Sequence, residues 1–131
     1  MEVTRTSENY LKTMLILMKK NGYVRAVDVA NRLHITRSSA SNAVKQLLGE
    51  GYLTLDEHKF IRLTPRGEAI AESALLRHSF YESLLLAAGV RPEQADEDAG
   101  EMTKTLSEES FLRLRETMGD HLKAATGSQR G

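Results

Sequence analysis

The segment T-R-S-S-A-S-N-A-V-K-Q-L-L-G-E-G, residues 36–51, is the starting point for interpreting the chain. Thr36 is a good N-cap, because its hydroxyl can accept a hydrogen bond from a backbone N–H of the first helical turn. Small and aliphatic residues recur behind it at helical spacing and predict one buried face. They are Ala40, Ala43, Val44, Leu47 and Leu48. The segment therefore predicts an amphipathic helix that ends near Gly51.

The other sides of this helix carry short hydrogen-bonding side chains and cations, with no acid before Glu50. Asparagine can pair with adenine, and arginine or lysine with guanine or phosphate. The pattern favours a helix that reads DNA, and the alternative is an ordinary surface helix. The residues expected to contact DNA are Arg37, Ser38, Ser39, Ser41, Asn42 and Lys45.

The preceding residues predict two further helices. Residues 7–20 predict a helix capped by Ser7, after a frayed arm of residues 1–6. A short helix over residues 27–33 follows, and a tight turn at His34 leads into the polar helix. This order is the helix-turn-helix pattern.

The hydrophobic period changes after Gly51 from helical to alternating, which predicts strands over residues 52–55 and 60–63. A hairpin directly after a recognition helix is typical of a wing. Lys59 and Arg62 are expected to contact phosphate there. The alternative is a hairpin that only covers the core.

The second half predicts helices only. Thr64 caps a long helix that continues to Gly89, and further helices are expected over residues 91–104 and after Ser107. The expected fold class is therefore mainly α with a small β-hairpin. A winged helix-turn-helix DNA-binding domain over residues 1–66 precedes a helical dimerisation domain over residues 67–124 and a disordered tail over residues 125–131.

The charge of the chain sums to zero but is unevenly distributed. Residues 1–67 hold eleven Lys/Arg and six Asp/Glu, whereas residues 68–131 hold seven and twelve. A basic first half suits a polyanion, although a chance division of solvated charges gives the same totals.

The absence of cysteine excludes disulfides and thiolate metal sites. No Gly-rich phosphate loop or Ser/His/Asp pattern indicates an enzyme. No apolar run is long enough to span a bilayer, so a cytoplasmic protein without a membrane partner is expected.

Short motifs occur in a nearly gapless order between residues 7 and 122. They are S-E-N-Y-L (7–11), G-Y-V-R (22–25), D-V-A-N-R-L (28–33), Ser38-Ser39, L-T-P-R-G (63–67), Arg77-His78, and D-E-D-A and T-L-S between Asp96 and Ser107. This set resembles the diphtheria-toxin-repressor and manganese-transport-regulator family, in its shorter two-domain form. The resemblance implies a repressor that binds an inverted-repeat operator in double-stranded DNA as a homodimer. It also implies a dimer interface that includes Leu75, Tyr81, Leu84 and Leu85.

Members of that family are activated by a divalent metal, and the resemblance assigns six positions to its ligands. In this chain they are Asn9, Lys12, His78, Gly100, Thr103 and Lys104. Only the histidine keeps a usable donor, and an ammonium group has no lone pair and repels a dication. We therefore expect a degenerate sensor site, no metal cofactor, and a homodimeric transcriptional regulator that does not use divalent metal.

Two alternatives remain open at the level of sequence. A displaced Mn or Fe site can be built from His78, Glu97, Asp98 and Glu101, although these acids can equally form a solvated face beside the lysines. If the acids form a solvated face, His78 is a packed, hydrogen-bonded residue. The second alternative is a degenerate paralogue that acts as an interaction module by forming heterodimers with a true family member.

Overall fold

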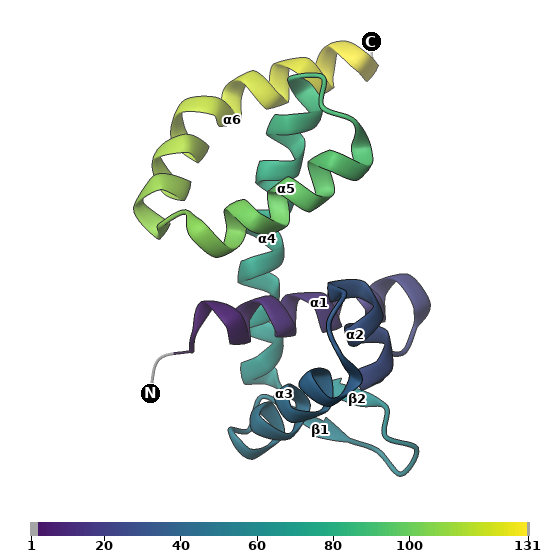
Figure 1. The fold of residues 1–131 in the computed structure, drawn as a ribbon. Helices are drawn as coiled ribbons and strands as arrows, with labels where there is room; N and C mark the ends of the chain where they lie inside the picture. The colour runs from purple at the N-terminus through teal and green to yellow at the C-terminus, as the bar shows by residue number, and fades with distance from the viewer. Residues whose placement is uncertain (1–2, 131) are drawn as a thin grey trace. The chain divides into compact units, whose positions relative to one another are not determined.

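The computed structural model describes residues 3–130, and side chains as far as residue 119. Over this range the chain forms helices and one two-stranded antiparallel hairpin (Figure 1). The predicted mainly α fold with a small hairpin is confirmed. Contacts divide the chain into two compact units, Met1–Leu75 and Leu76–Gly131, called the winged unit and the helical unit below. The elements are α1 (Arg5–Asn21), α2 (Ala26–Leu33), α3 (Arg37–Gly49), β1 (Leu53–Leu55), β2 (Ile61–Leu63), α4 (Pro65–Ala87), α5 (Pro92–Thr105) and α6 (Glu108–Arg130).

Helix α1 begins earlier than the sequence predicts. Thr4 is the N-cap, and its Oγ1 accepts a hydrogen bond of 3.0 Å from the backbone N–H of Ser7. Ser7, the expected cap, therefore lies in the first turn, where it is buried. Arg5, expected in a frayed arm, is helical. Thr4 and Ser7 each carry a hydroxyl that can cap a helix. Because Ser7 is buried, Thr4 is the cap.

Helix α3 has the expected start, because Thr36 Oγ1 accepts from the backbone N–H of Ser39 at 3.1 Å. Its buried face consists of Ala40, Val44 and Leu47, which repeat at i, i+4 and i+7. Leu48 was also predicted to be buried, but it is 40% exposed. It stands one position beyond this repeat, so the rotation of the helix turns it away from the core.

The hairpin pairs Leu53 with Leu63 and Leu55 with Ile61. Its strands are shorter than predicted, because Tyr52 does not join the ladder. The N–H of Tyr52 donates to the carbonyl of Leu47, and its own carbonyl accepts from the N–H of Thr64. Tyr52 thus links α3 to the start of α4.

The first turns of α4 pack into the core of the winged unit. Ala71 is fully buried in that core, and Ile70 and Leu75 pack against it. Gly67 allows this approach, because a Cβ at that position would lie 1.9 Å from the carbonyl oxygen of Tyr52. The winged unit therefore extends to Leu75, past the domain boundary expected after residue 66.

The helical unit has a small aromatic core of its own. Tyr81 of α4 is fully buried, and its ring centroid lies 6.0 Å from that of Phe111 in α6. Leu84 and Leu85 pack against this cluster. Helix α6 continues to Arg130, so residues 125–130 of the tail expected to be disordered are helical, and residue 131 lies outside the described residues. No helix in the described residues is long and apolar enough to cross a membrane.

Candidate functional site

The exposed face of α3 carries the side chains expected to read DNA. Arg37, Asn42 and Lys45 are exposed, and Ser41 is half-buried. Ser38 and Ser39 are exposed but join the cap, since the Thr36 hydroxyl lies 3.2 and 2.8 Å from their hydroxyls. The first turn of α3 contains no acid, so the positive end of the helix dipole is not neutralised there. The face therefore combines a capped, acid-free helix N-terminus with the exposed polar side chains of Arg37, Asn42 and Lys45.

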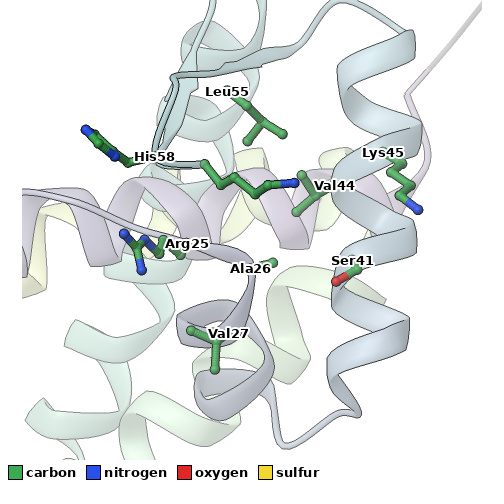
Figure 2. A pocket seen from close by; sticks show the side chains of 9 residues that line it. Arg25, Ala26, Val27, Ser41, Val44, Lys45, Leu55 and His58 are labelled. Carbon is green, nitrogen blue, oxygen red and sulfur yellow. The ribbon is translucent and has the colours of Figure 1, made fainter.

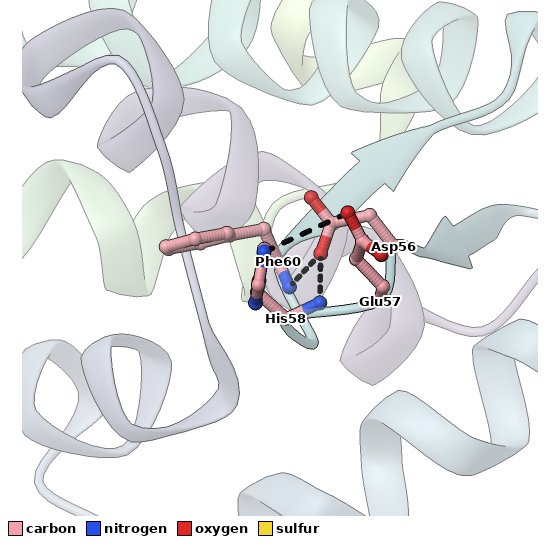
Figure 3. A network of polar contacts seen from close by, with 4 residues as sticks. All are labelled: Asp56, Glu57, His58 and Phe60. Carbon is pink, nitrogen blue, oxygen red and sulfur yellow. Dashed lines mark hydrogen bonds and ion pairs between the residues drawn. The ribbon is translucent and has the colours of Figure 1, made fainter.

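The wing is held by the carboxylate of Asp56. Its Oδ1 accepts from the backbone N–H groups of His58 at 2.8 Å and Phe60 at 3.0 Å (Figure 3). Desolvation acts to raise the pKa of Asp56, but these two N–H groups and the charges of His58 and Arg62 outweigh it. The pKa of Asp56 therefore lies below its ordinary value. No role was assigned to Asp56 from the sequence, although an Asp that opens a turn is a known signal for such a cap.

The turn presents two cations. Lys59 adopts a left-handed backbone conformation with φ 66°, and its backbone N–H donates to the carbonyl of Asp56 at 3.0 Å. Lys59 is exposed in the turn, and Arg62 is exposed on β2. The structure thus leaves both side chains accessible for the phosphate contact that the sequence predicts.

A second support for the wing comes from the segment between α1 and α2. The Arg25 guanidinium carbon lies 4.2 Å from the ring centroid of Phe60, and that ring makes an edge contact of 5.5 Å with Tyr23. The N–H of Ile61 also donates to the carbonyl of Val24 at 2.8 Å. Sequence reasoning missed this contact, because no local pattern relates residues 23–25 to the hairpin.

A cluster of titratable groups forms in the helical unit between α4 and α5. His78 is 5% exposed, and its Nε2 lies 2.8 Å from Oδ1 of Asp96. Glu82 completes the group, and ligand atoms of the three side chains lie within 4.8 Å of one another. An imidazole and two carboxylates are donors that suit a divalent cation. The histidine is thus packed and hydrogen-bonded, as one sequence-based alternative expected.

The acids expected in a displaced metal site lie elsewhere. Glu97 and Glu101 are exposed, and Glu101 pairs with Lys104 at 3.0 Å. Asp98 accepts a hydrogen bond of 2.9 Å from Gln94. The two carboxylates that do approach His78 were missed. The spacing of Glu82, four residues after His78 on one helix, was the available signal.

The six positions that the resemblance assigns to metal ligands offer few donor atoms for a divalent cation. In the helical unit Thr103 is buried and its hydroxyl donates to the carbonyl of Ala99 at 2.7 Å, while Lys104 is held by Glu101. Gly100 has no side chain to offer. In the winged unit Lys12 is 3% exposed, and Asn9 is half-buried on the same helix. A buried ammonium and a hydroxyl donor at these positions do not fit a metal ion.

The residues expected at a dimer interface lie largely within cores. Tyr81 is fully buried in the helical unit, and Leu84 and Leu85 are half-buried against it. Leu75 packs against the core of the winged unit. Among the residues whose side chains are described, the helical unit exposes three large apolar side chains, Leu76, Leu86 and Leu112, which are 51%, 44% and 47% exposed.

Family profiles match both parts of the chain. The profile described as "Iron dependent repressor, N-terminal DNA binding domain" matches residues 2–60, and "Iron dependent repressor, metal binding and dimerisation domain" matches residues 64–129. The HTH-type transcriptional regulator MntR of Lysinibacillus sphaericus (strain C3-41) is 30% identical over 111 residues, which cover 85% of this chain and 80% of that protein. The transcriptional regulator MntR of Salmonella typhimurium is 32% identical over 104 residues, which cover 79% of this chain and 66% of that protein.

Solved structures share the fold. The crystal structure of T. acidophilum IdeR matches with a TM-score of 0.75 and 30% identity, over 91% of this chain and 55% of that one. A manganese-dependent transcriptional repressor in complex with manganese matches with a TM-score of 0.74 and 23% identity, over 86% of this chain and 52% of the other. This chain therefore spans about half the length of these two structures, and the second supports the fold alone.

Proposed function

Because this chain belongs to the iron-dependent repressor family of DNA-binding transcriptional regulators, we propose that it binds an operator through α3 and the wing, as a homodimer. The observation that carries this proposal is the exposed, acid-free polar face of α3 in the same unit as a wing that exposes Lys59 and Arg62. Arg37 and Asn42 supply base-reading groups, and Lys45, Lys59 and Arg62 supply phosphate contacts. A dimer of winged units implies an inverted repeat with half-sites about one helical turn apart.

Selection of bound duplexes by the purified chain, with a chelator present, tests this function directly. We expect an inverted-repeat motif, and a titration with that duplex should then saturate at two chains per site. Selection of an asymmetric single-copy motif would contradict the homodimer. Failure to enrich any motif would contradict the reading role of α3.

We further infer that the regulator does not bind metal at the six family positions. The buried ammonium of Lys12, the hydroxyl donor of Thr103 and the pair formed by Lys104 with Glu101 support this inference. DNA binding then does not depend on metal at these positions.

A second candidate function is a response to a divalent cation at His78, Glu82 and Asp96. The grouping of their ligand atoms within 4.8 Å favours it. A bound cation would supply fixed positive charge to two carboxylates in the helical unit. The alternative is a purely structural cluster, because the hydrogen bond between His78 and Asp96 satisfies the histidine without a cation.

Calorimetry with manganese separates the two candidates. If the cluster is a cation site, the parent binds one manganese ion, Glu82→Gln abolishes binding and the control Glu101→Gln leaves it unchanged. If the cluster is structural, no stoichiometric site appears and DNA affinity is the same in manganese and in chelator. Binding that survives Glu82→Gln would exclude the cluster as the metal site.

A further inference from the structure

The winged unit contains a cavity of about 310 Å³ between the start of α2, helix α3 and the wing (Figure 2). This volume lies at the lower end of the roughly 300–1,000 Å³ that is typical of small-molecule sites. Its walls come from three separate elements of one compact unit. The cavity is therefore a concave feature of the folded unit rather than a gap in a single loop.

The cavity has an aliphatic lining at its centre. Ala26 and Val27 contribute from α2, Val44 from α3 and Leu55 from β1. In Figure 2 the side chains of Ala26, Val44 and Leu55 point toward the middle of the cleft, whereas Lys45 points away from it. Apolar surface of this kind favours a ligand with an apolar body, because covering it releases water.

The rim of the cavity carries two cations and an imidazole, and Glu57 lies 3.7 Å from that imidazole. Arg25, His58 and Lys59 line it from the α1–α2 connection and the wing, and no Asp or Glu is among the lining residues. The guanidinium of Arg25 is held over the ring of Phe60 at 4.2 Å, so little side-chain freedom is lost when it contacts an anion. Ser41 adds a hydroxyl from α3.

These features together point to one class of ligand. We propose that the cleft between α2, α3 and the wing binds a small amphipathic anion, a carboxylate carried on an apolar ring. The ring covers the aliphatic centre, and the carboxylate meets the cations of the rim. A DNA phosphodiester alone would use only the cations and leave the aliphatic surface hydrated.

This site has a regulatory consequence, which rests on the proposed DNA-binding function. Ser41 and Lys59 line the cleft and also belong to the proposed DNA-contacting set. A ligand that occupies the cleft competes with DNA for these side chains. Binding of the anion and of DNA are therefore negatively coupled, and the anion acts as an inducer that releases the operator.

The site is tested first without DNA, by NMR of the full chain titrated with 1-naphthoate. We expect saturable shifts of backbone amides that centre on Ala26, Val27, Ser41 and Val44. The neutral isostere 1-naphthamide lacks the charge, and acetate lacks the ring, so each should bind at least about tenfold more weakly. Shifts that centre on the helical unit, or no saturable shift, would overturn the proposal.

Two variants locate the ligand. Ala26→Leu fills the cleft without changing charge, and should weaken 1-naphthoate binding by at least about tenfold. Its matched control is Ala69→Leu at an exposed position of α4, which should bind as the parent does. Arg25→Gln leaves the cavity open and removes a rim charge, so it should weaken 1-naphthoate but not 1-naphthamide. Parent-like affinity in both cleft variants would exclude this site.

The coupling is tested by adding 1-naphthoate to the complex with the selected duplex. The parent should lose DNA affinity as the ligand saturates the cleft, and Ala26→Leu should bind DNA but resist release. Naphthoate binding at the cleft with unchanged DNA affinity would overturn the regulatory role. The two proposals fail separately. If the chain alone does not bind DNA, only the proposed function is contradicted. If the chain does not bind naphthoate, only the proposed site is contradicted.

Discussion

The winged unit and the helical unit place their polar side chains in opposite ways. In the winged unit Arg37, Asn42 and Lys45 lie exposed within nine consecutive residues of one helix. In the helical unit His78 is buried and meets Asp96 from a different helix. An exposed reading face needs only a helix, a cap and the right periodicity. A buried polar cluster needs two helices that pack at one particular rotation. The rotation of a single helix therefore decides which side chains belong to the cluster.

The largest effect that tests this contrast is expected at Gly67 in the winged unit. Gly67→Ala places a Cβ 1.9 Å from the Tyr52 carbonyl oxygen, so α4 must move away from the core. We expect a loss of about 3 kcal/mol in the free energy of unfolding. The control is Gly49→Ala, whose Cβ meets no atom within 4 Å, and which should be neutral or slightly stabilising. Thermal and denaturant unfolding measure both, and equal stabilities would show that α4 does not pack as described.

In the helical unit the corresponding pair is Leu84→Asp and Leu86→Asp. Leu84 packs against the aromatic core, and a charge there should cost about 2–3 kcal/mol in unfolding free energy. Leu86 is 44% exposed, so its replacement should leave the melting temperature nearly unchanged. If exposed leucines form the dimer contact, Leu86→Asp should instead shift the sedimentation equilibrium toward monomer. A Leu84→Asp chain that remains folded but monomeric would instead support the dimer interface that was predicted from the sequence.

The exposed face of α3 predicts an effect on binding rather than on stability. Arg37→Ala or Asn42→Ala should weaken binding to the selected duplex by about 1–3 kcal/mol, because each removes a group that we propose to contact a base or phosphate. Lys20→Ala, at an exposed position of α1, serves as the control and should bind as the parent does. Helical content should be equal in all of these chains. Anisotropy titrations that find parent affinity in both α3 variants would exclude α3 as the reading helix.

The smallest effect concerns the wing turn and its pH dependence. Asp56 has a pKa below its ordinary value of 3.8, so its carboxylate stabilises the turn above that pH. The stabilisation is lost as pH falls through the lower pKa of the folded state. Asp56→Ala should remove this dependence and speed exchange of the amides of His58 and Phe60, which donate to the carboxylate. Hydrogen exchange followed from about pH 5 down to about pH 2 measures it, and amides equally protected in the variant would contradict the role of Asp56.

The parts of the molecule that follow from short stretches could be predicted. Thr36 caps α3 and Pro65 begins α4 as expected, because a cap depends on a few consecutive residues. The choice between Thr4 and Ser7 could not be made locally, since both offer a hydroxyl and only burial of Ser7 distinguishes them. The exposure of Leu48 could not be predicted locally either, because it depends on which residues of α3 pack against the core.

The sequence by itself determined the helix-turn-helix and the wing, since each depends on residue identity or local periodicity. Only the tertiary structure decided which acid of α5 meets His78. Helix α5 buries Ala95, Ala99 and Thr103, a stripe of small side chains with little apolar contrast to reveal its rotation in sequence. Packing of that stripe turns Asp96 toward α4 and leaves Glu97 and Glu101 exposed. The cleft beside α3 likewise exists only after α2, α3 and the wing come together, because its lining residues are too far apart in the sequence to form a local pattern.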